Sequence, residues 1–459
     1  MKYYINTYGC QMNVHESEKL AGILQSMGYT LADDDKSADV VVFNTCAIRE
    51  SAEQKIFGNI GSLKGVKQKN PNMIIAVCGC MSQQEGYDQL IAKKYPYVDI
   101  IFGTHNLAKF SELLRQRQQT KKRVVEITQT EDIKLRDNMI ATRTSGVNAW
   151  VNITYGCNNF CTYCIVPYVR GREVSRPLQD IIAEVDTLLK QGYKQITLLG
   201  QNVNSYGNDI PDDKVNFANL LKQIDQLNYK FRLRFMTSHP KDLTKDVLQV
   251  MAEGEHICKY LHLPLQSGSD AVLKAMNRHY LSADYLKLID LAKKLMPQIE
   301  FSSDIIVGFP GETEDDFNAT LQIIKKVRYQ QLFTFIYSKR KGTVAATMQN
   351  QIPLEVKKQR LRQLIECQHQ IATEISSKYI GKTLEVLVEG VHPKKSGYLM
   401  GTTDFGKTIS FAGTDNLLGS FVQVEVIKAN NTTLIGKVVS VEQPCGIKYA
   451  MPTDKTRRN

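Results

Sequence analysis

The chain lacks any long apolar segment. Nothing in its 459 residues approaches the roughly 18 consecutive apolar residues that a membrane-spanning helix needs, so we expect no membrane segment. Residues 1–7 also lack the apolar core of a secretion signal. Together the two absences predict a cytoplasmic protein.

A fourth metal ligand is missing beside the densest group of thiols. Cys157, Cys161 and Cys164 are spaced Cys-x3-Cys-x2-Cys, with no further cysteine or histidine close by in sequence. Structural zinc takes four ligands, commonly in two pairs, so this spacing disfavours a zinc knuckle. Thiolates favour iron–sulfur clusters. A four-iron cluster on three thiolates would leave one iron open to a further ligand, which suits chemistry as well as electron storage.

The cysteine content and the charge balance narrow the possible functions. Ten cysteines in a long chain without a secretion signal indicate metal binding or catalysis rather than disulfides. The net charge of +11 favours a polyanionic partner, because lysine and arginine neutralise phosphates and release counterions. Many cytosolic proteins are mildly basic, so charge alone leaves a nucleic-acid partner open.

Strand and helix patterns alternate along most of the chain, which predicts an α/β fold. Short β-branched runs between helical stretches predict a parallel sheet domain in residues 1–118, and residues 119–145 are expected to be a linker around a short strand at 124–127. Residues 146–376 predict a (β/α)6 part-barrel, whose active site would lie at the carboxyl ends of its strands. Its expected strands are residues 149–153, 195–199, 231–235, 260–263, 301–307 and 332–337.

The pattern changes after a charged helix near residues 355–377. Short β segments at 384–388, 422–426 and 433–441 predict a small antiparallel barrel of OB-like type in residues 379–443, a common platform for oligonucleotides. Four lysines of this barrel are expected to contact an RNA backbone: Lys394, Lys395, Lys407 and Lys437. Residues 444–459 are expected to be a tail.

Three further cysteines follow successive strands of the first domain. Cys10, Cys46 and Cys80 each come just after a predicted strand, and the carboxyl ends of parallel strands share the edge where open α/β folds bind ligands. A single buried cysteine is often only a small apolar side chain. Placement in three successive units favours a second cluster site with an open iron. Cys78 is an alternative third ligand. We prefer Cys80, because Cys80 lies further past the strand end.

These motifs resemble a known family. The spacing of the thiols after a strand that opens a βα domain resembles the radical S-adenosylmethionine (SAM) superfamily. The whole chain, apart from its last residues 442–459, resembles the methylthiotransferases, and within them the bacterial tRNA-2-methylthio-dimethylallyladenosine synthases. The last β region resembles their TRAM domain, and the family pattern selects Cys80 over Cys78. The matching segments are residues 7–13, 44–50, 79–84, 155–177, 199–204, 238–240, 262–269 and 307–313.

The resemblance implies an enzyme with two [4Fe-4S] clusters, each held by one of the two cysteine triads. The cluster on Cys157, Cys161 and Cys164 would cleave SAM to a 5′-deoxyadenosyl radical. That radical would take hydrogen from C2 of N6-(dimethylallyl)adenosine beside the tRNA anticodon. The other cluster would present sulfur, methylated by a second SAM. SAM contacts, with ordinary turn chemistry as the alternative for each, are expected at Gln201, Asn202, Gln266, Ser267, Gly308 and Gly311.

Other functions stay open at this point. One is a methylthiotransferase that acts on threonylcarbamoyl-adenosine of tRNA or on a ribosomal protein. Another, from a different class, is a non-catalytic RNA-binding protein with a structural metal. An enzyme of the expected kind needs an electron donor and a supplier of sulfur or clusters as partners, and we expect it to be a monomer. The sequence identifies neither partner, nor a role for Cys78.

Overall fold

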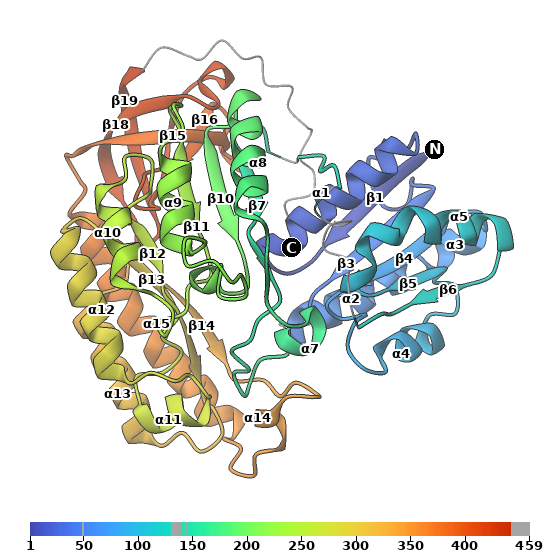
Figure 1. The fold of residues 1–459 in the computed structure, drawn as a ribbon, viewed down its shortest axis with the longest axis horizontal. Coiled ribbons are helices and arrows are strands. Elements are labelled where there is room, and N and C mark those ends of the chain that lie inside the picture. The colour runs from blue at the N-terminus through green and yellow to red at the C-terminus, as the bar shows by residue number, and fades with distance from the viewer. Residues whose placement is uncertain (48–49, 130–136, 138, 144, 442–459) are drawn as a thin grey trace.

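The protein consists of three structural units. The structure is a computed structural model, which describes residues 1–47, 50–129, 137, 139–143 and 145–441. An N-terminal sheet domain lies beside a larger central domain, and a small β-barrel packs on one end of the central domain (Figure 1). Within the described residues, no helix has the length and apolar character needed to cross a membrane. The expected tail at 444–459 falls outside these residues.

The N-terminal domain is a parallel sheet covered by helices on both faces, as expected. Its strand order is β2-β1-β3-β4-β5-β6, and every neighbouring pair is parallel. The strands are β1 (Lys2–Thr7), β2 (Thr30–Leu31), β3 (Val40–Thr45), β4 (Ile74–Gly79), β5 (Ile100–Phe102) and β6 (Val124–Glu126). The helices are α1 (Gln11–Ser26), α2 (Glu50–Ser62), α3 (Lys64–Lys69), α4 (Tyr87–Lys94), η1 (Thr104–Lys109) and α5 (Phe110–Thr120).

Successive side chains of the central strands point to opposite faces of the sheet, which explains why both faces are covered. Val40 and Val42 of β3 pack with α1 and α5 on one face, whereas Val41 and Phe43 pack with α2 and α4 on the other. A strand buried on both faces reads as a continuous apolar run, which is the signal that the sequence carries here. β6 pairs with β5, so the strand expected inside the linker is an edge strand of this sheet, which extends past residue 118.

The central domain holds six parallel-paired strands in two groups of three, ordered β11-β10-β7 and β12-β13-β14. A parallel bridge from Leu233 to Ile257 lies between the two groups, and one core runs through the domain. The strands, with a short outer pair β8 and β9, are β7 (Asn148–Asn152), β8 (Thr154–Tyr155), β9 (Val174–Ser175), β10 (Gln195–Leu199), β11 (Arg232–Phe235), β12 (Tyr260–His262), β13 (Glu300–Val307) and β14 (Gln331–Ile336).

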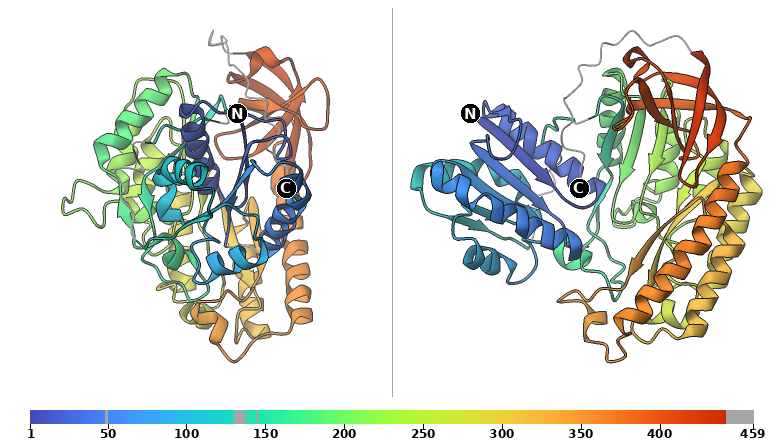
Figure 2. Two further views of the ribbon diagram at one scale, coloured as in Figure 1. Left: turned by 90° about the vertical axis from the view of Figure 1, so that its right-hand side faces the viewer. Right: turned by 180° about the vertical axis from the view of Figure 1, so that it is seen from behind.

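Helices lie along the outside of these strands (Figures 1 and 2). The part-barrel expected from the sequence is therefore the observed architecture. The helices of this domain are α7 (Val166–Arg170), α8 (Leu178–Lys190), η2 (Val203–Ser205), α9 (Phe217–Asp225), α10 (Lys245–Glu253), α11 (Asp270–Ala275), α12 (Ser282–Leu295), α13 (Glu314–Val327), α14 (Val344–Thr347) and α15 (Leu354–Ser377).

The C-terminal unit is a closed five-stranded barrel in the order β15-β16-β17-β19-β18. One neighbouring pair, β17 with β19, is parallel, so the barrel is not wholly antiparallel as expected. The sequence pattern also missed two strands, β16 and β17. The elements are β15 (Thr383–Val391), β16 (Tyr398–Thr402), β17 (Thr408–Ala412), η3 (Asp415–Leu417), β18 (Phe421–Ala429) and β19 (Thr433–Val441).

This barrel packs against the amino ends of the central strands. At the start of β11, Arg232 donates to the carbonyl of Thr402 and to Glu385, and Arg234 donates to the carbonyl of Asp404 at 3.1 Å. At the start of β14, Gln330 donates to the carbonyl of Phe405. The carboxyl ends of the central strands, where the first cysteine motif lies, are at the opposite end of the domain.

Candidate active site

The central cysteine loop begins just beyond β7 and β8, at the carboxyl end of the part-barrel. Its backbone is held by the turn after α11: Thr162 N donates to the carbonyl of Met276 at 3.1 Å, and Asn277 Nδ2 donates to the carbonyl of Phe160 at 3.1 Å. Phe160 has φ of +46°, a conformation that non-glycine residues adopt only when the surroundings enforce it. The loop is thus a rigid platform for Cys157, Cys161 and Cys164.

A buried arginine faces this loop from the same turn. Arg278 Nη1 donates to Cys161 Sγ at 3.4 Å, and Nη2 donates to the carbonyl of Pro264 at 3.0 Å. The guanidinium is 4% exposed, so its charge acts on the thiol with little screening by water. The positive charge thus lies beside a sulfur that a cluster would take as its ligand. The sequence carried no sign of this residue, because no spacing motif connects position 278 to the thiol loop.

The second cysteine site lies along one edge of the N-terminal sheet. Cys46 directly follows β3, Cys80 directly follows β4, and Cys10 immediately precedes α1 as its N-cap residue. The strand ends are in register, since Thr45 is opposite Gly79 in the β3–β4 pair. Parallel pairing therefore brings three thiols that are far apart in sequence to one edge, as expected.

The side-chain amide of Asn13 connects the segments that follow β1 and β3. Asn13 Nδ2 donates to the carbonyl of Tyr8 at 2.7 Å and to that of Thr45 at 3.0 Å, while its Oδ1 lies 3.8 Å from Cys10 Sγ. Asn13 is fully buried, so these bonds are not exchanged with water. The helix that starts at Gln11 is thereby fixed against the ends of β1 and β3.

Cys78 and Cys80 occupy different surroundings although only one residue separates them. Cys78 is a member of β4 and packs in the apolar core between the sheet, α1 and α5. Cys80 has left the strand and packs against Ala47, Ile165 and Val169, the last two from the central domain. This placement agrees with the preference for Cys80 as the residue at the site.

Glycine at position 79 permits the turn into Cys80, and alanine there is expected to disrupt the site. Gly79 has φ of +94°, and a Cβ atom would lie 2.5 Å from the carbonyl oxygen of Thr45. We expect Gly79→Ala to cost about 3 kcal/mol, from left-handed strain and overpacking against backbone. Gly28→Ala is the matched control, because Gly28 also has positive φ but faces open space. Thermal unfolding and iron content after reconstitution measure the difference; equal losses in both variants would contradict the crowding argument.

Of the six thiols, four are buried and two, Cys10 and Cys164, are half-buried, and burial governs the ionisation of three of the six. It raises the pKa of Cys157 to about 11, and those of Cys164 and Cys80 to about 12, because a buried thiolate loses hydration. Neighbouring thiols also raise the pKa of Cys80 and of Cys164, which places each of these two beside the other members of its triad. No three His, Cys, Asp or Glu side chains in the described ranges are arranged around a single metal ion. A cluster of several irons holds its ligands further apart, and iron provides the positive charge that stabilises buried thiolates, so both triads fit such a group.

The six residues expected to contact SAM divide into three sets. Gln201 Oε1 and Asn202 Oδ1, at the end of β10, are buried and have no hydrogen-bond partner among the described residues. Asn202 Nδ2 meanwhile donates to Asp242 Oδ2 at 2.7 Å, which fixes the amide. Since buried polar atoms rarely lack a partner, these two oxygens are suited to a polar ligand.

The second set has structural roles in the fold. Ser267 Oγ accepts from Ser269 N at 3.2 Å and lies 3.4 Å from Thr320 Oγ1. Gly308 N donates to Glu312 Oε1 at 2.9 Å, and Gly308 and Gly311 both have positive φ, at +72° and +82°. These contacts and dihedral angles are typical of turns, which was the alternative for each residue, and SAM contact at these three positions stays a prediction. 

Gln266 combines structure and strain. Its main chain bridges to β13, donating to Asp304 O at 2.9 Å and accepting from Ile306 N, at φ of +71°. A non-glycine residue in this conformation stores strain, a feature that concentrates at functional sites.

Glu173 is a further buried acid near the thiol loop that the sequence reasoning missed. Its Oε2 accepts from Ser205 Oγ at 2.6 Å, and its main-chain N donates to Asn158 Oδ1 at 3.2 Å, beside Cys157. Burial, together with the nearby charges of Asp209 and Asp242, raises the pKa of this carboxyl to about 7. Glu173 lay inside a segment that carries the family resemblance, but its burial could not be inferred from the sequence.

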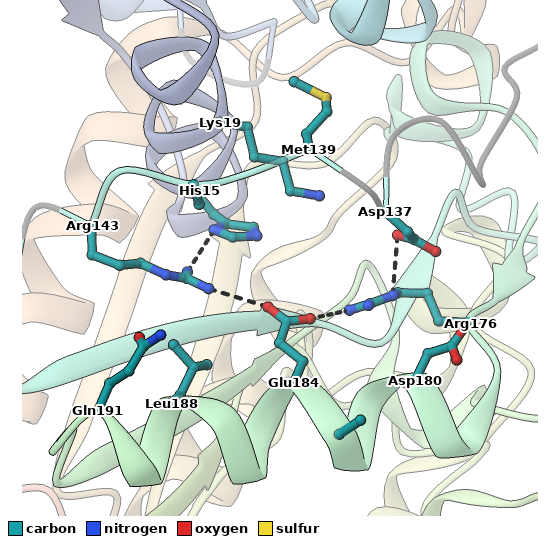
Figure 3. A pocket seen from close by; sticks show the side chains of 12 residues that line it. His15, Lys19, Asp137, Met139, Arg143, Arg176, Asp180, Glu184, Leu188 and Gln191 are labelled. Carbon is teal, nitrogen blue, oxygen red and sulfur yellow. Dashed lines mark hydrogen bonds and ion pairs between the residues drawn. The ribbon is translucent and has the colours of Figure 1, made fainter. Parts of the chain in front are cut away.

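A cavity of about 420 Å³ lies between α1 and α8 at the joint of the two domains (Figure 3). None of the residues expected to form a site lines it. Two arginines of its lining form ion pairs: Arg143 contacts Glu18 at 3.2 Å and Glu184 at 3.1 Å, and Arg176 contacts Glu184 at 2.8 Å. These ion pairs connect the N-terminal helix α1 to α8, so the cavity belongs to the joint between the domains.

The four lysines expected to contact RNA are not equivalent. Lys394, Lys395 and Lys437 are exposed on the C-terminal barrel. Lys407 is 2% exposed, its Nζ donates to the carbonyl of Asn431 at 3.3 Å, and burial lowers its pKa to about 8. A side chain so enclosed cannot reach a phosphate, and the expectation for Lys407 is corrected.

Comparisons with known proteins agree with this architecture. Family models match at residues 2–103 (Uncharacterized protein family UPF0004), 151–324 (Radical SAM superfamily) and 377–439 (TRAM domain). The solved radical S-adenosylmethionine methyltransferase TsrM from Kitasatospora setae shares the fold, with a TM-score of 0.54 and 14% identity over 75% of this chain and 73% of that one.

Curated relatives are much closer in sequence. The tRNA-2-methylthio-N(6)-dimethylallyladenosine synthase of Clostridium tetani is 50% identical over 95% of this chain and 96% of its own length. The enzyme of the same name from Acetivibrio thermocellus is 49% identical over 95% of this chain and 91% of its own. This chain therefore belongs to the family of tRNA-2-methylthio-N(6)-dimethylallyladenosine synthases, radical SAM enzymes with a TRAM domain.

Proposed function

We propose that the protein methylthiolates C2 of N6-(dimethylallyl)adenosine beside the anticodon of tRNA. In this function Cys157, Cys161 and Cys164 hold one [4Fe-4S] cluster at the mouth of the part-barrel. Cys10, Cys46 and Cys80 hold the other at the sheet edge. The observation that carries the proposal is the presence of two largely buried thiol triads in a chain half identical to enzymes of that name.

The bound groups supply the one-electron chemistry and the methylthio group, and the chain supplies position and electrostatics. Arg278 stabilises the charge on Cys161, and the turn at residues 275–278 keeps the thiol loop rigid. Gln201 and Asn202 offer their two buried oxygens to the amino or hydroxyl groups of SAM. Burial of the triads excludes water from a reaction that proceeds through a radical.

The location of the C-terminal barrel favours a large, structured substrate. The barrel packs against the amino ends of the central strands, whereas the thiols are at the carboxyl ends. Strands of five to eight residues at ~3.3 Å per residue are roughly 15–25 Å long. A free nucleoside cannot contact both ends, but an RNA stem–loop can, with its exposed loop base at the thiols.

We expect the exposed lysines of the barrel to strengthen tRNA binding through phosphate contacts. The triple variant Lys394→Gln, Lys395→Gln, Lys437→Gln should bind tRNA more weakly, with the slope of log affinity against log salt smaller by about 2. Lys407→Met is the matched control, since this lysine is buried, and its salt slope should equal that of the parent. If the triple variant kept the salt slope of the parent, the barrel could not be part of the RNA interface.

Mass spectrometry of tRNA nucleosides tests the function as a whole. A strain that lacks this gene should accumulate the dimethylallyl nucleoside without its methylthio group, and the cloned gene should restore the product. Loss of a methylthio group from threonylcarbamoyl-adenosine instead would favour the alternative tRNA substrate. Anaerobic reconstitution should give about eight irons per chain, four for each cluster. Roughly one zinc without SAM cleavage would instead support the non-catalytic RNA-binding protein.

An electron donor and a supplier of sulfur or clusters complete the proposed cycle. The chemistry requires one electron for each SAM cleavage and a sulfur atom for each product. The described residues provide no internal source of electrons beyond the two cluster sites. Both partners are therefore expected to be separate molecules that reach the chain between turnovers.

A further inference from the structure

Arg170 connects the two cysteine sites through the short helix α7. It follows Cys164 by six residues, but its guanidinium lies in the N-terminal domain. Nη1 donates to Glu16 Oε1 at 2.6 Å, and Nη2 donates to Glu16 Oε2 at 3.2 Å and to Asn13 Oδ1 at 2.8 Å. The two partners of the ion pair are 5% and 2% exposed. A bidentate, buried pair of this kind fixes both side chains with little freedom.

The same helix covers the second cysteine site. Ile165 and Val169 pack against Cys80, and the Val169 carbonyl accepts from Thr104 Oγ1 at 2.5 Å. Arg170 Nη2 and Cys10 Sγ both lie next to the same acceptor, Asn13 Oδ1, at 2.8 Å and 3.8 Å. The central domain thus contributes a cation to a site whose three thiols come from the N-terminal domain.

The charges of Arg170 and Glu16 should affect the reduction potential of a cluster at the second cysteine site. A four-iron cluster on three thiolates carries net negative charge, and reduction adds one more negative charge. A buried cation nearby stabilises the reduced form, and a buried anion destabilises it. Arg170 and Glu16 therefore act on a cluster in opposite directions, although they hold each other in place.

We propose that Arg170, which belongs to the central domain, is a positioning residue of the second cysteine site. There it raises the reduction potential of the cluster on Cys10, Cys46 and Cys80. This rests on the proposed function, which assigns that cluster. The potential of the second cluster then depends on docking of the two domains. Docking does not rest on Arg170 alone, because Arg143 joins Glu18 of α1 to Glu184 of α8.

The test is a redox titration of the second cluster in the full chain. Replacing Cys157, Cys161 and Cys164 by alanine leaves only the second site, whose reduced signal is followed by electron paramagnetic resonance. In this background Arg170→Met should lower the potential by about 59 mV, a tenfold change in the one-electron equilibrium. Glu16→Gln should raise it by a similar amount. Arg117→Met, which removes the cation of the Arg117–Asp99 pair at the amino end of β5, should leave it unchanged.

The sign of each shift decides between an electrostatic and a merely structural role. Opposite shifts in Arg170→Met and Glu16→Gln support the proposal, because each variant breaks the same ion pair. Shifts in the same direction, or none, overturn it. If Arg170→Met takes up no cluster, the sign of the shift in reduction potential in Glu16→Gln decides alone. If the background chain itself takes up no iron, the second cluster of the proposed function fails, and this inference fails with it.

Discussion

Cys161→Ala is expected to reduce SAM cleavage at least a thousandfold, equivalent to about 4 kcal/mol in the barrier. Cys161 is 8% exposed, and its Sγ is the atom that Arg278 contacts at 3.4 Å. A cluster cannot be held by the two remaining thiols of a triad that already lacks a fourth protein ligand. The measurement is 5′-deoxyadenosine formed from SAM under reducing conditions, together with the iron content per chain.

The iron content separates loss of one cluster from loss of the fold. Cys161→Ala should retain about four irons, those of the N-terminal site. Cys258→Ala is the matched control, since Cys258 is also buried in the central domain but has no cysteine partner nearby in sequence. That variant should keep both clusters and nearly full cleavage. Full SAM cleavage by Cys161→Ala would refute the assignment of the central triad.

The strand ends explain why so much of the site could be predicted from the sequence. β3 and β4 are buried on both faces, so they read as unbroken apolar runs whose ends are visible from composition. Parallel pairing then places Cys46 and Cys80 at one edge without any knowledge of side-chain contacts. The same reasoning located the central thiol loop just beyond the first strand of the part-barrel.

Residues that act across long sequence distances could not be predicted in this way. Arg278 contacts a thiol 117 residues away, and Arg170 pairs with a carboxylate 154 residues away. No local periodicity records such contacts, which depend on how turns and domains pack. The burial of Lys407 has the same origin, since an isolated lysine between polar residues normally indicates an exposed position.

The strands missed in the C-terminal barrel show a limit of pattern reading. β16 and β17 contain glycine, serine and threonine, and they flank a turn at residues 403–407. Only alternate residues such as Leu399 and Ile409 enter the core, so each strand carries a weak apolar signal. Pairing with β15 and β19 stabilises them, and that pairing is a property of the closed barrel rather than of either segment.

Cys80→Ala is expected to separate the two halves of the reaction. SAM cleavage by the central cluster should continue, because Cys80 belongs to the other triad, while the methylthio product should fall to background. Iron content should drop to about four per chain. The measurements are 5′-deoxyadenosine and methylthio nucleoside from the same assay with tRNA. A variant that still forms product would exclude Cys80 as a ligand of the sulfur-presenting cluster.

Cys78→Ala provides the matched control two positions away. Cys78 is fully buried in the core on one face of β4, whereas Cys80 lies beyond the strand end against α7. Losing the Cys78 sulfur should cost about 1–2 kcal/mol of stability through a small cavity. Both clusters and both products should survive. If Cys78→Ala lost the cluster and Cys80→Ala kept it, the third ligand would be Cys78. The β4 end would then have to unwind by at least a residue, so that the thiol could leave the core and reach Cys10 and Cys46.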